Sequence, residues 1–269
     1  MSSQFDKARQ AQAERQGRFL IAIGITLIVG IVAIGIYFSA DQESNRIDPE
    51  TLCGSAPPLY VDLIIDATDP YNPTQRRYLQ QFIQRLIVDL PVSSRLAIHP
   101  VRDQTPRLPT LVRCKPEDGH NANPLYQNRA QIQQQWQHDF MVPVEAQFTR
   151  LTEQEGADQS PLMETIQAVA IESYQPLPLA RPKRLIIISD LLQHTEGWSH
   201  YNDPIALEAL EQRPYYQRLR TDLRGAEVEF LMIRRAGFDQ LQQQRLAMFW
   251  AEYVTNMGGK FISITMVDG

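Results

Sequence analysis

The chain has 269 residues and a formal net charge of −5, with 13 glycines and two cysteines. The acidic balance argues against a nucleic-acid partner, for which a basic face is expected. Neither a Gly-rich phosphate loop, a Gly-x-Ser-x-Gly elbow nor a His-Glu-x-x-His motif occurs, so the common nucleotide-binding, serine-hydrolase and zinc-protease motifs are excluded.

The first predicted element is a transmembrane helix at residues 19–38. These twenty residues carry no charge, and about 20 apolar residues are needed to cross a bilayer core. Residues 1–18 contain four Lys or Arg residues, whereas residues 41–50 contain one. Because basic flanks stay in the cytoplasm, we expect a single-pass protein of the cytoplasmic membrane. Its N-terminus lies inside, and its C-terminal domain is periplasmic or extracellular.

The apolar segment has two alternative interpretations. A cleaved signal peptide has a shorter apolar core and small residues before the cut, but cleavage after Ala40 would place Phe38 at the third position before it. A buried core helix is rarely apolar on every face. An uncleaved anchor is therefore the prediction.

Residues 39–57 are polar and predict a tether between the membrane and a folded domain. Cys53 lies in this tether and Cys114 in the domain. Disulfides form in oxidising compartments outside the cytoplasm, so these two cysteines predict one bridge. Two unrelated buried thiols are the alternative.

Apolar strands and amphipathic helices alternate after the tether. A helix begins with Asn72 as its cap and Pro73 in its first turn, and ends before Pro91. A polar loop is predicted at 116–128, and Pro143 interrupts the helix that follows it. The predicted strands are 59–65, 95–101, 110–115, 185–188, 228–233 and 261–267.

The second half of the chain continues the alternation. Helical patterns occupy 162–170, 204–223 and 246–253, with Asp203 as a cap, a break at Pro214, and Gly258 as a terminator. Strands separated by helices predict a mostly parallel sheet covered on both faces. The fold class is therefore α/β, with three layers and six strands in one domain over 58–269.

Two of the predicted strands end in aspartate, at Asp66 and Asp190. Ligands of parallel sheets bind beyond the carboxyl ends of the strands, so both carboxylates are expected in one crevice. Ser160 precedes the intervening helix and can reach the same place. Carboxylate and hydroxyl oxygens suit Mg²⁺, which makes magnesium the candidate cofactor.

This pattern resembles the von Willebrand factor A domain and its metal-ion-dependent adhesion site. Asp66 and Thr68 match the first two positions of the metal loop, Ser160 stands for the Thr that opens a later helix, and Asp190 matches the last Asp. The resemblance implies a metal site at these four residues, completed by an acidic side chain of a partner protein. The third loop position is Pro70, which has no side-chain ligand, so metal-bound and metal-free versions stay open.

Simpler structural roles exist for the same residues. Asp66 and Asp69 suit a turn before a capped helix, Ser160 followed by a proline suits a helix cap, and Asp190 can bound the loop after its strand. The joint pattern, rather than any one residue, carries the predicted site.

The predicted function is protein binding, not catalysis. The strand-end face, with Asp69, Trp198 and Tyr201 and the loops 116–128 and 193–203, is expected to recognise another envelope or membrane protein. A metal-free structural subunit of an envelope assembly is the alternative. A metal-dependent hydrolase using Asp66 and Asp190 is a third, but no base is evident for it.

Overall fold

A computed structural model describes residues 28–32, 47–102, 109–153 and 156–268. Contacts divide the chain into two units, 1–47 and 48–269. The predicted transmembrane helix and cytoplasmic segment lie outside the described residues, apart from 28–32, which are helical. Within the described ranges, no helix combines the length and the apolar character needed to cross a bilayer.

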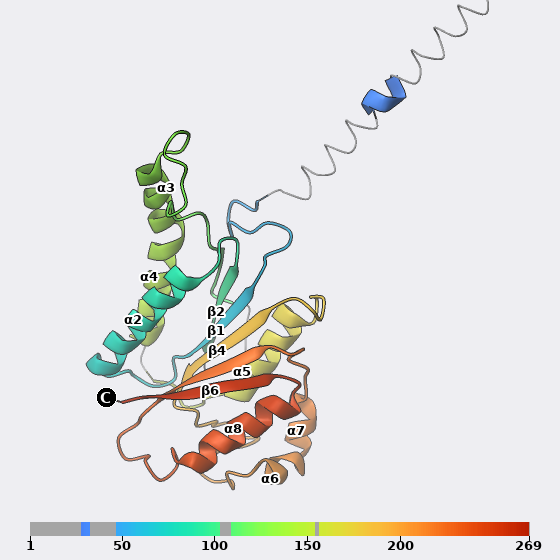
Figure 1. The fold of residues 1–269 in the computed structure, drawn as a ribbon. Helices are drawn as coiled ribbons and strands as arrows, with labels where there is room; N and C mark the ends of the chain where they lie inside the picture. The colour runs from blue at the N-terminus through green and yellow to red at the C-terminus, as the bar shows by residue number, and fades with distance from the viewer. Residues whose placement is uncertain (1–27, 33–46, 103–108, 154–155, 269) are drawn as a thin grey trace, which may run out of the picture. The chain divides into compact units, whose positions relative to one another are not determined.

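The second unit is built on one six-stranded sheet with the order β3-β2-β1-β4-β5-β6 (Figure 1). Only β2 and β3 pair antiparallel, and every other neighbouring pair is parallel. The predicted sheet of six mostly parallel strands is confirmed. The strands are β1 Tyr60–Asp66, β2 Arg95–Val101, β3 Leu111–Cys114, β4 Lys183–Ser189, β5 Glu227–Ile233 and β6 Lys260–Val267.

The central strands are apolar on both faces because helices cover both faces. Leu63 and Ile186 are fully buried in one core cluster, and their neighbours Ile64 and Ile187 are fully buried in the other. Alternate strand residues point to opposite faces, so the near-continuous apolar runs of β1 and β4 fill two cores at once.

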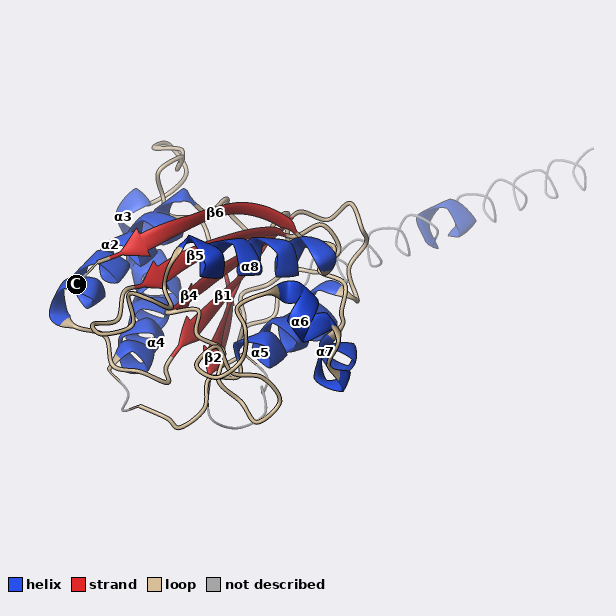
Figure 2. Ribbon diagram, turned by 90° about the horizontal axis from the view of Figure 1, so that it is seen from below, coloured by secondary structure: helices blue, strands red, loops and turns tan. Residues whose placement is uncertain are grey.

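Figure 2 shows α5, α6, α7 and α8 on one face of the sheet and α2 and α4 on the other. The core clusters follow this division, since one contains α5 to α8 and the other α2 and α4. The helices are α2 Pro73–Asp89, α3 Arg129–Trp136, α4 Val142–Thr152, α5 Leu162–Val169, α6 Leu207–Glu211, α7 Pro214–Leu219 and α8 Gln244–Asn256, with π-helical turns η1 Gln137–Met141 and η2 Ala170–Tyr174.

The start of α2 agrees with the prediction from Asn72 and Pro73. The Asn72 side chain accepts a hydrogen bond from the backbone N–H of Gln75, and the Gln75 side chain accepts one from the N–H of Asn72. This reciprocal pair is a capping box. It fixes where the chain turns after β1, directly beside the strand-end aspartate Asp66.

Two predicted helix details differ in the structure. Pro143 does not break its helix, because the π-helical turn η1 lets the N–H of Val142 bond to Gln137 O and joins α3 to α4. Asp203 does not cap a helix either. Its carboxylate instead accepts from Ser199 N at 3.0 Å and from Arg213 Nη2 at 3.2 Å.

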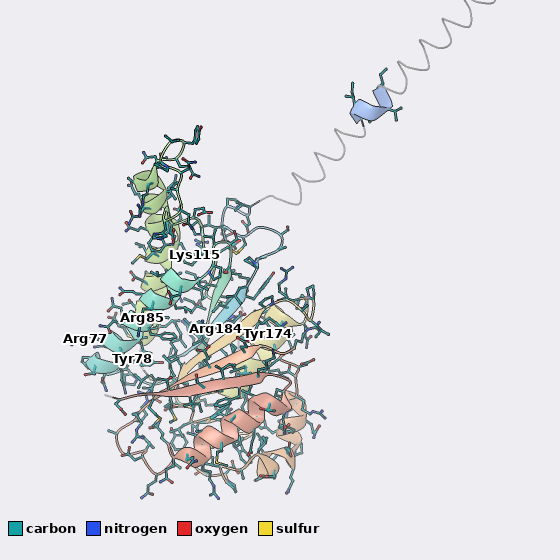
Figure 3. All side chains as sticks on the ribbon, viewed as in Figure 1. Arg77, Tyr78, Arg85, Lys115, Tyr174 and Arg184 are labelled. Atoms are coloured by element: carbon teal, nitrogen blue, oxygen red, sulfur yellow. A yellow bond between two sulfur atoms is a disulfide. The ribbon has the colours of Figure 1, made fainter. Side chains whose placement is uncertain are left out.

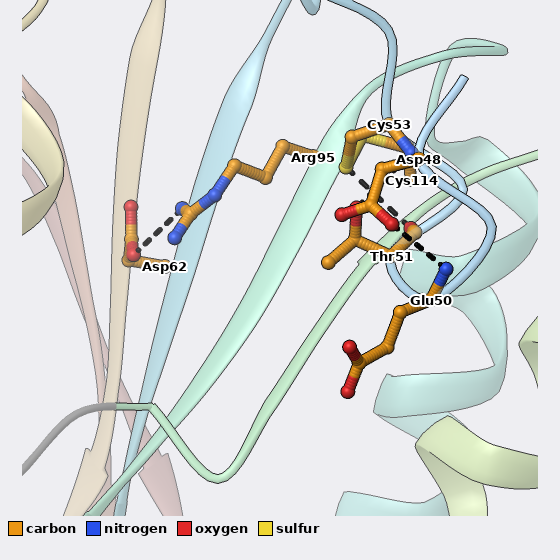
Figure 4. Close-up of a disulfide and its surroundings, with 7 residues drawn as sticks. All are labelled: Asp48, Glu50, Thr51, Cys53, Asp62, Arg95 and Cys114. Carbon is orange, nitrogen blue, oxygen red and sulfur yellow. Dashed lines mark hydrogen bonds and ion pairs between the residues drawn. A yellow bond between two sulfur atoms is a disulfide. The ribbon is translucent and has the colours of Figure 1, made fainter. Parts of the chain in front are cut away.

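The predicted disulfide between Cys53 and Cys114 is confirmed (Figure 4). Cys114 also donates its backbone N–H to Thr51 O at 2.7 Å, so residues of the predicted tether from 48 onward belong to the folded unit. Cys114 pairs with Arg95, the first residue of β2. The tether therefore joins the domain at the edge where the parallel strands begin, away from their carboxyl ends.

Candidate functional site

The carboxyl ends of β1, β4 and β5 lie side by side at one edge of the sheet. Ile65 pairs with Ile188 in the neighbouring strand, so Asp66 and Asp190 follow their strands at the same level. The structure thus brings the two predicted aspartates together. This edge is the usual ligand-binding position of a parallel sheet.

Asp66 is buried, and each of its carboxylate oxygens accepts hydrogen bonds. Oδ1 accepts from the N–H of Thr68 at 3.1 Å and from its hydroxyl at 2.5 Å. Oδ2 accepts from the hydroxyls of Ser160 at 3.1 Å and Ser189 at 2.7 Å. Four donors from three residues thus hold this carboxylate in place. Asp66 therefore organises this edge rather than serving only as a turn residue.

Ser160 contributes to the site and not to a helix cap. Its hydroxyl donates to Asp66, and the residue before α5 is Pro161, which provides no side-chain cap. The backbone of Ser160 exchanges two hydrogen bonds with His194, at 2.9 and 3.0 Å. These bonds tie the start of α5 to the loop after β4 and explain how Ser160 reaches Asp66.

Asp190 is paired with a cation from the chain itself, Arg235. The guanidinium Nε of Arg235 lies 3.4 Å from Asp190 Oδ2, its Nη2 lies 3.7 Å from Asp69 Oδ2, and its Nη1 donates to Pro70 O at 2.5 Å. The other carboxylate oxygen of Asp190 accepts from the N–H of Leu192 at 2.9 Å. The guanidinium of Arg235 thus links Asp69 and Pro70, which follow β1, to Asp190, which follows β4.

Nearby charges shift the pKa of Asp190 in opposite directions. Burial, followed by the negative charge of Asp66, raises the pKa of Asp190 to about 7, although Arg235 and the Leu192 N–H lower it. Two carboxylates that share one low-dielectric site resist double ionisation. Arg235 supplies the positive charge that this pair needs.

These residues do not fit a magnesium ion well. The carbonyl of Pro70 and the carboxylates of Asp190 and Asp69 already face the guanidinium of Arg235. A divalent cation would meet this positive charge at close range. Among the described residues, no cluster of three or more His, Cys, Asp or Glu side chains is arranged to hold a metal.

A cavity of about 270 Å³ opens beside Thr68 and Ser160, whose hydroxyls donate to Asp66. Tyr201 and Phe238 line it, with ring centroids 5.7 Å apart in an edge-to-face arrangement, and they are 40% and 39% exposed. Thr68, Asp69 and Asp158 are also in the wall. The accessible part of the site therefore contains aromatic and acidic side chains, while Asp66 and Asp190 are buried.

Two of the three predicted partner-contacting residues are available on this face. Tyr201 is exposed, and Asp69 lies on the rim of the cavity. Trp198, however, is only 1% exposed and belongs to a hydrophobic core. The bridge between His194 and Ser199 folds the loop back on itself, which turns Trp198 inward under Arg213.

The loop at 116–128 does not frame the strand-end face. It follows Cys114, which pairs with the first residue of β2, and so it leaves the sheet from the opposite edge. An antiparallel edge strand reverses the chain direction. This reversal separates the loop from Asp66 and Asp190.

Sequence reasoning missed four residues that shape the site. Arg235 pairs with Asp190 and stacks 5.6 Å from the Tyr71 ring centre, and the Tyr71 hydroxyl donates to Asp66 O at 2.5 Å. Ser189 donates to Asp66, and Gln242 donates to the carbonyl of Asp190 at 3.1 Å. A signal existed for Arg235, because it follows β5 at the same edge.

His200 makes this region sensitive to acid. It is buried against Phe249, with ring centroids 4.7 Å apart, and burial lowers its pKa from 6.5 to about 4. Between about pH 6.5 and pH 4 this histidine is protonated in the unfolded chain but neutral in the folded chain. The free energy of unfolding therefore falls as the pH falls through this range. By about pH 4.5 the loss attributable to His200 is about 2 kcal/mol.

Urea unfolding across this pH range checks the expectation. His200→Gln should remove the loss, so that the stability difference between variant and wild type changes by about 2 kcal/mol between neutral pH and about pH 4.5. Parallel curves for the two proteins would show that His200 does not titrate in this way.

No known family model matches the chain, and no curated protein matches it. Among solved structures, it is similar to the VWA domain of SpRpn10, with 12% identity, 77% of this chain and 87% of that chain covered, and a TM-score of 0.36. It is also similar to a von Willebrand factor type A protein from Catenulispora acidiphila, with 16% identity and a TM-score of 0.38. That match covers 79% of this chain and 40% of the other.

Proposed function

We propose that this protein is a membrane-anchored, protein-binding module with a von Willebrand factor A-like domain outside the cytoplasm. Its strand-end face recognises an envelope or membrane protein without a metal ion. The observation that carries the proposal is the exposed pair of Tyr201 and Phe238, which line the cavity beside Thr68 and Ser160 at the strand ends. Aromatic side chains in such positions are the usual anchors of protein interfaces.

The arrangement supports binding better than catalysis. Both oxygens of Asp66 are occupied by hydroxyl and N–H donors, and Asp190 is buried behind Arg235. The hydrolase considered from the sequence would use Asp66 and Asp190, and both of these carboxylates are engaged inside the domain. The residues that line the accessible cavity include Tyr201, Phe238 and Asp69.

The proposal predicts that binding depends on the aromatic pair. Tyr201→Ala combined with Phe238→Ala should weaken binding of the native partner at least about tenfold, since such anchors contribute 2 kcal/mol or more. The partner is identified by cross-linking the full-length chain in its own membranes. Its affinity is then measured for each variant.

A matched control is available at the other end of the sheet. Phe261 and Ile262 of β6 are exposed to a similar extent, at 37% and 49%, and replacing both with alanine should leave the partner bound. If each cross-linked protein binds the aromatic variant as tightly as wild type, the strand-end face is not the binding surface.

A metal-free site also predicts no response to magnesium. The melting temperature of the full-length protein should be the same in Mg²⁺ and in chelator, because Arg235 already compensates the charge of Asp190. A rise with Mg²⁺ that disappears in Asp66→Ala and in Asp190→Ala would support the metal-bound version instead. If the protein is instead a structural subunit of an envelope assembly, Mg²⁺ should also have no effect, but the assembly should persist when Tyr201 and Phe238 are both replaced with alanine.

A further inference from the structure

A projecting arm, residues 117–136, leaves the domain after β3. It consists of the loop 117–128 and the helix α3, of which only Trp136 is buried. Figure 1 shows α3 and this loop extending beyond the C-terminal end of α2, on the side where residues 48–57 join the domain. Because α3 continues through η1 into the packed helix α4, it is held by this continuation, and most of its own surface is left exposed.

The tip of the arm presents two large apolar side chains to solvent. Leu125 is 81% exposed and Tyr126 is 85% exposed. The turn that holds them is well bonded. Asn123 Oδ1 accepts from Leu125 N at 2.9 Å, and Gln127 and Asn123 are joined by two further bonds of 2.7 and 2.9 Å. The tip is therefore a formed turn that displays a leucine and a tyrosine.

The base of the arm is fastened to the tether. Cys114 precedes the arm and is bridged to Cys53. Lys115, labelled in Figure 3, donates to Val88 O at 2.7 Å at the end of α2. The arm and the tether thus leave the same edge of the domain, opposite the strand-end face.

The tether limits how far the folded unit can lie from the predicted membrane span. That span ends at residue 38, and the folded unit begins at residue 48. The nine residues between them can extend at most about 30 Å. The eight residues of α3 have a length of about 12 Å.

The outer part of the arm carries no carboxylate. Glu117 and Asp118 lie at its base, where Lys115 pairs with Asp118 at 3.5 Å, whereas residues 119–136 contain no Asp or Glu and include Arg129. Anionic lipid headgroups therefore meet no carboxylate in this stretch. Tyrosine and leucine together are typical of side chains at the boundary between headgroups and acyl chains.

We propose that the tip of the arm, Leu125 and Tyr126, inserts into the outer interface of the membrane that holds the anchor. This contact rests on the proposed membrane anchoring, and it gives the domain a second attachment point.

Fluorescence quenching by brominated lipids tests this contact. The full-length protein is reconstituted into vesicles of phosphatidylcholine and phosphatidylglycerol, with brominated phosphatidylcholine substituted in a parallel sample. Tyr126→Trp should lose most of its added fluorescence in the brominated vesicles. Phe238→Trp, at the opposite edge of the sheet, should lose none, and the wild-type protein provides the background of the three native tryptophans.

The outcomes separate the arm contact from the anchor. Washing the vesicles with alkali tests the anchor separately, because an anchored protein stays in the vesicles. If the protein stays but Tyr126→Trp is not quenched, or is quenched no more than Phe238→Trp, the arm contact is wrong and the anchor stands. Protein removed by alkali overturns both. If the tip cross-links to a protein and Tyr126→Trp is not quenched by the brominated lipid, the proposal is also wrong. Leu125→Asp should reduce the quenching of Tyr126→Trp, whereas Val88→Asp, exposed on α2, should not.

Discussion

Replacing Asp62 with alanine is expected to lower the free energy of unfolding by about 3 kcal/mol. Asp62 is fully buried in β1. Its Oδ1 lies 2.8 Å from His99 Nε2 and 2.8 Å from the Ser173 hydroxyl. The same oxygen lies 3.2 Å from Arg95 Nη1, and Figure 4 shows this ion pair. Removing the carboxylate leaves a largely buried guanidinium and two further polar groups without their acceptor, and such orphaned groups are costly.

An ion pair on neighbouring strands provides the matched control. Arg184 and Glu229 form two bonds of 2.8 and 2.9 Å, but both side chains are partly exposed. Glu229→Ala should therefore cost less than about 1 kcal/mol. Urea unfolding of both variants measures the difference. Equal losses would show that the Asp62 cluster contributes no more than a surface pair.

Acid should weaken the same cluster. Burial raises the pKa of Asp62, but the hydrogen bond and charge of His99, the charge of Arg95 and the Ser173 hydroxyl outweigh it, so the pKa lies below its usual value. The stabilisation is present above the unfolded pKa of about 4 and is lost as pH falls through the folded value. Asp62→Asn should not show this loss.

Removing the disulfide should cost a similar amount, about 3 kcal/mol. Cys53 and Cys114 are 61 residues apart, and a bridge over a loop of this length restricts the unfolded chain considerably. Cys53→Ser combined with Cys114→Ser should shift the urea midpoint of the full-length protein accordingly. Reduction of the wild type should reproduce the shift, and a shift below about 1 kcal/mol would contradict the expectation.

The same change should loosen the start of the domain. Without the bridge, residues 48–53 are held mainly by the bond from Cys114 N to Thr51 O and by local bonds to the Asp48 side chain. Hydrogen exchange at these residues should accelerate, while the central strands β1 and β4 stay protected.

Much of this architecture follows from local patterns. The apolar runs of β1 and β4 require cover on both faces, and the capping residues Asn72 and Gln75 set the start of α2. Strands alternating with helices require a mostly parallel sheet. From there, Asp66 and Asp190 fall at the same edge simply because parallel strands end together.

Contacts between segments far apart in the sequence decided which side chains face solvent at the site and which charges pair there. Whether Trp198 faces solvent depends on a loop that folds back across His194 and Ser199, and the direction of the loop at 116–128 depends on the antiparallel pairing of β3. The cation beside Asp190 is a guanidinium from 45 residues further along the chain. Hydrophobic periodicity describes how each segment buries its own surface. The partner of a buried charge is selected only when the whole sheet is assembled, because that is when water is removed and the charge must be compensated.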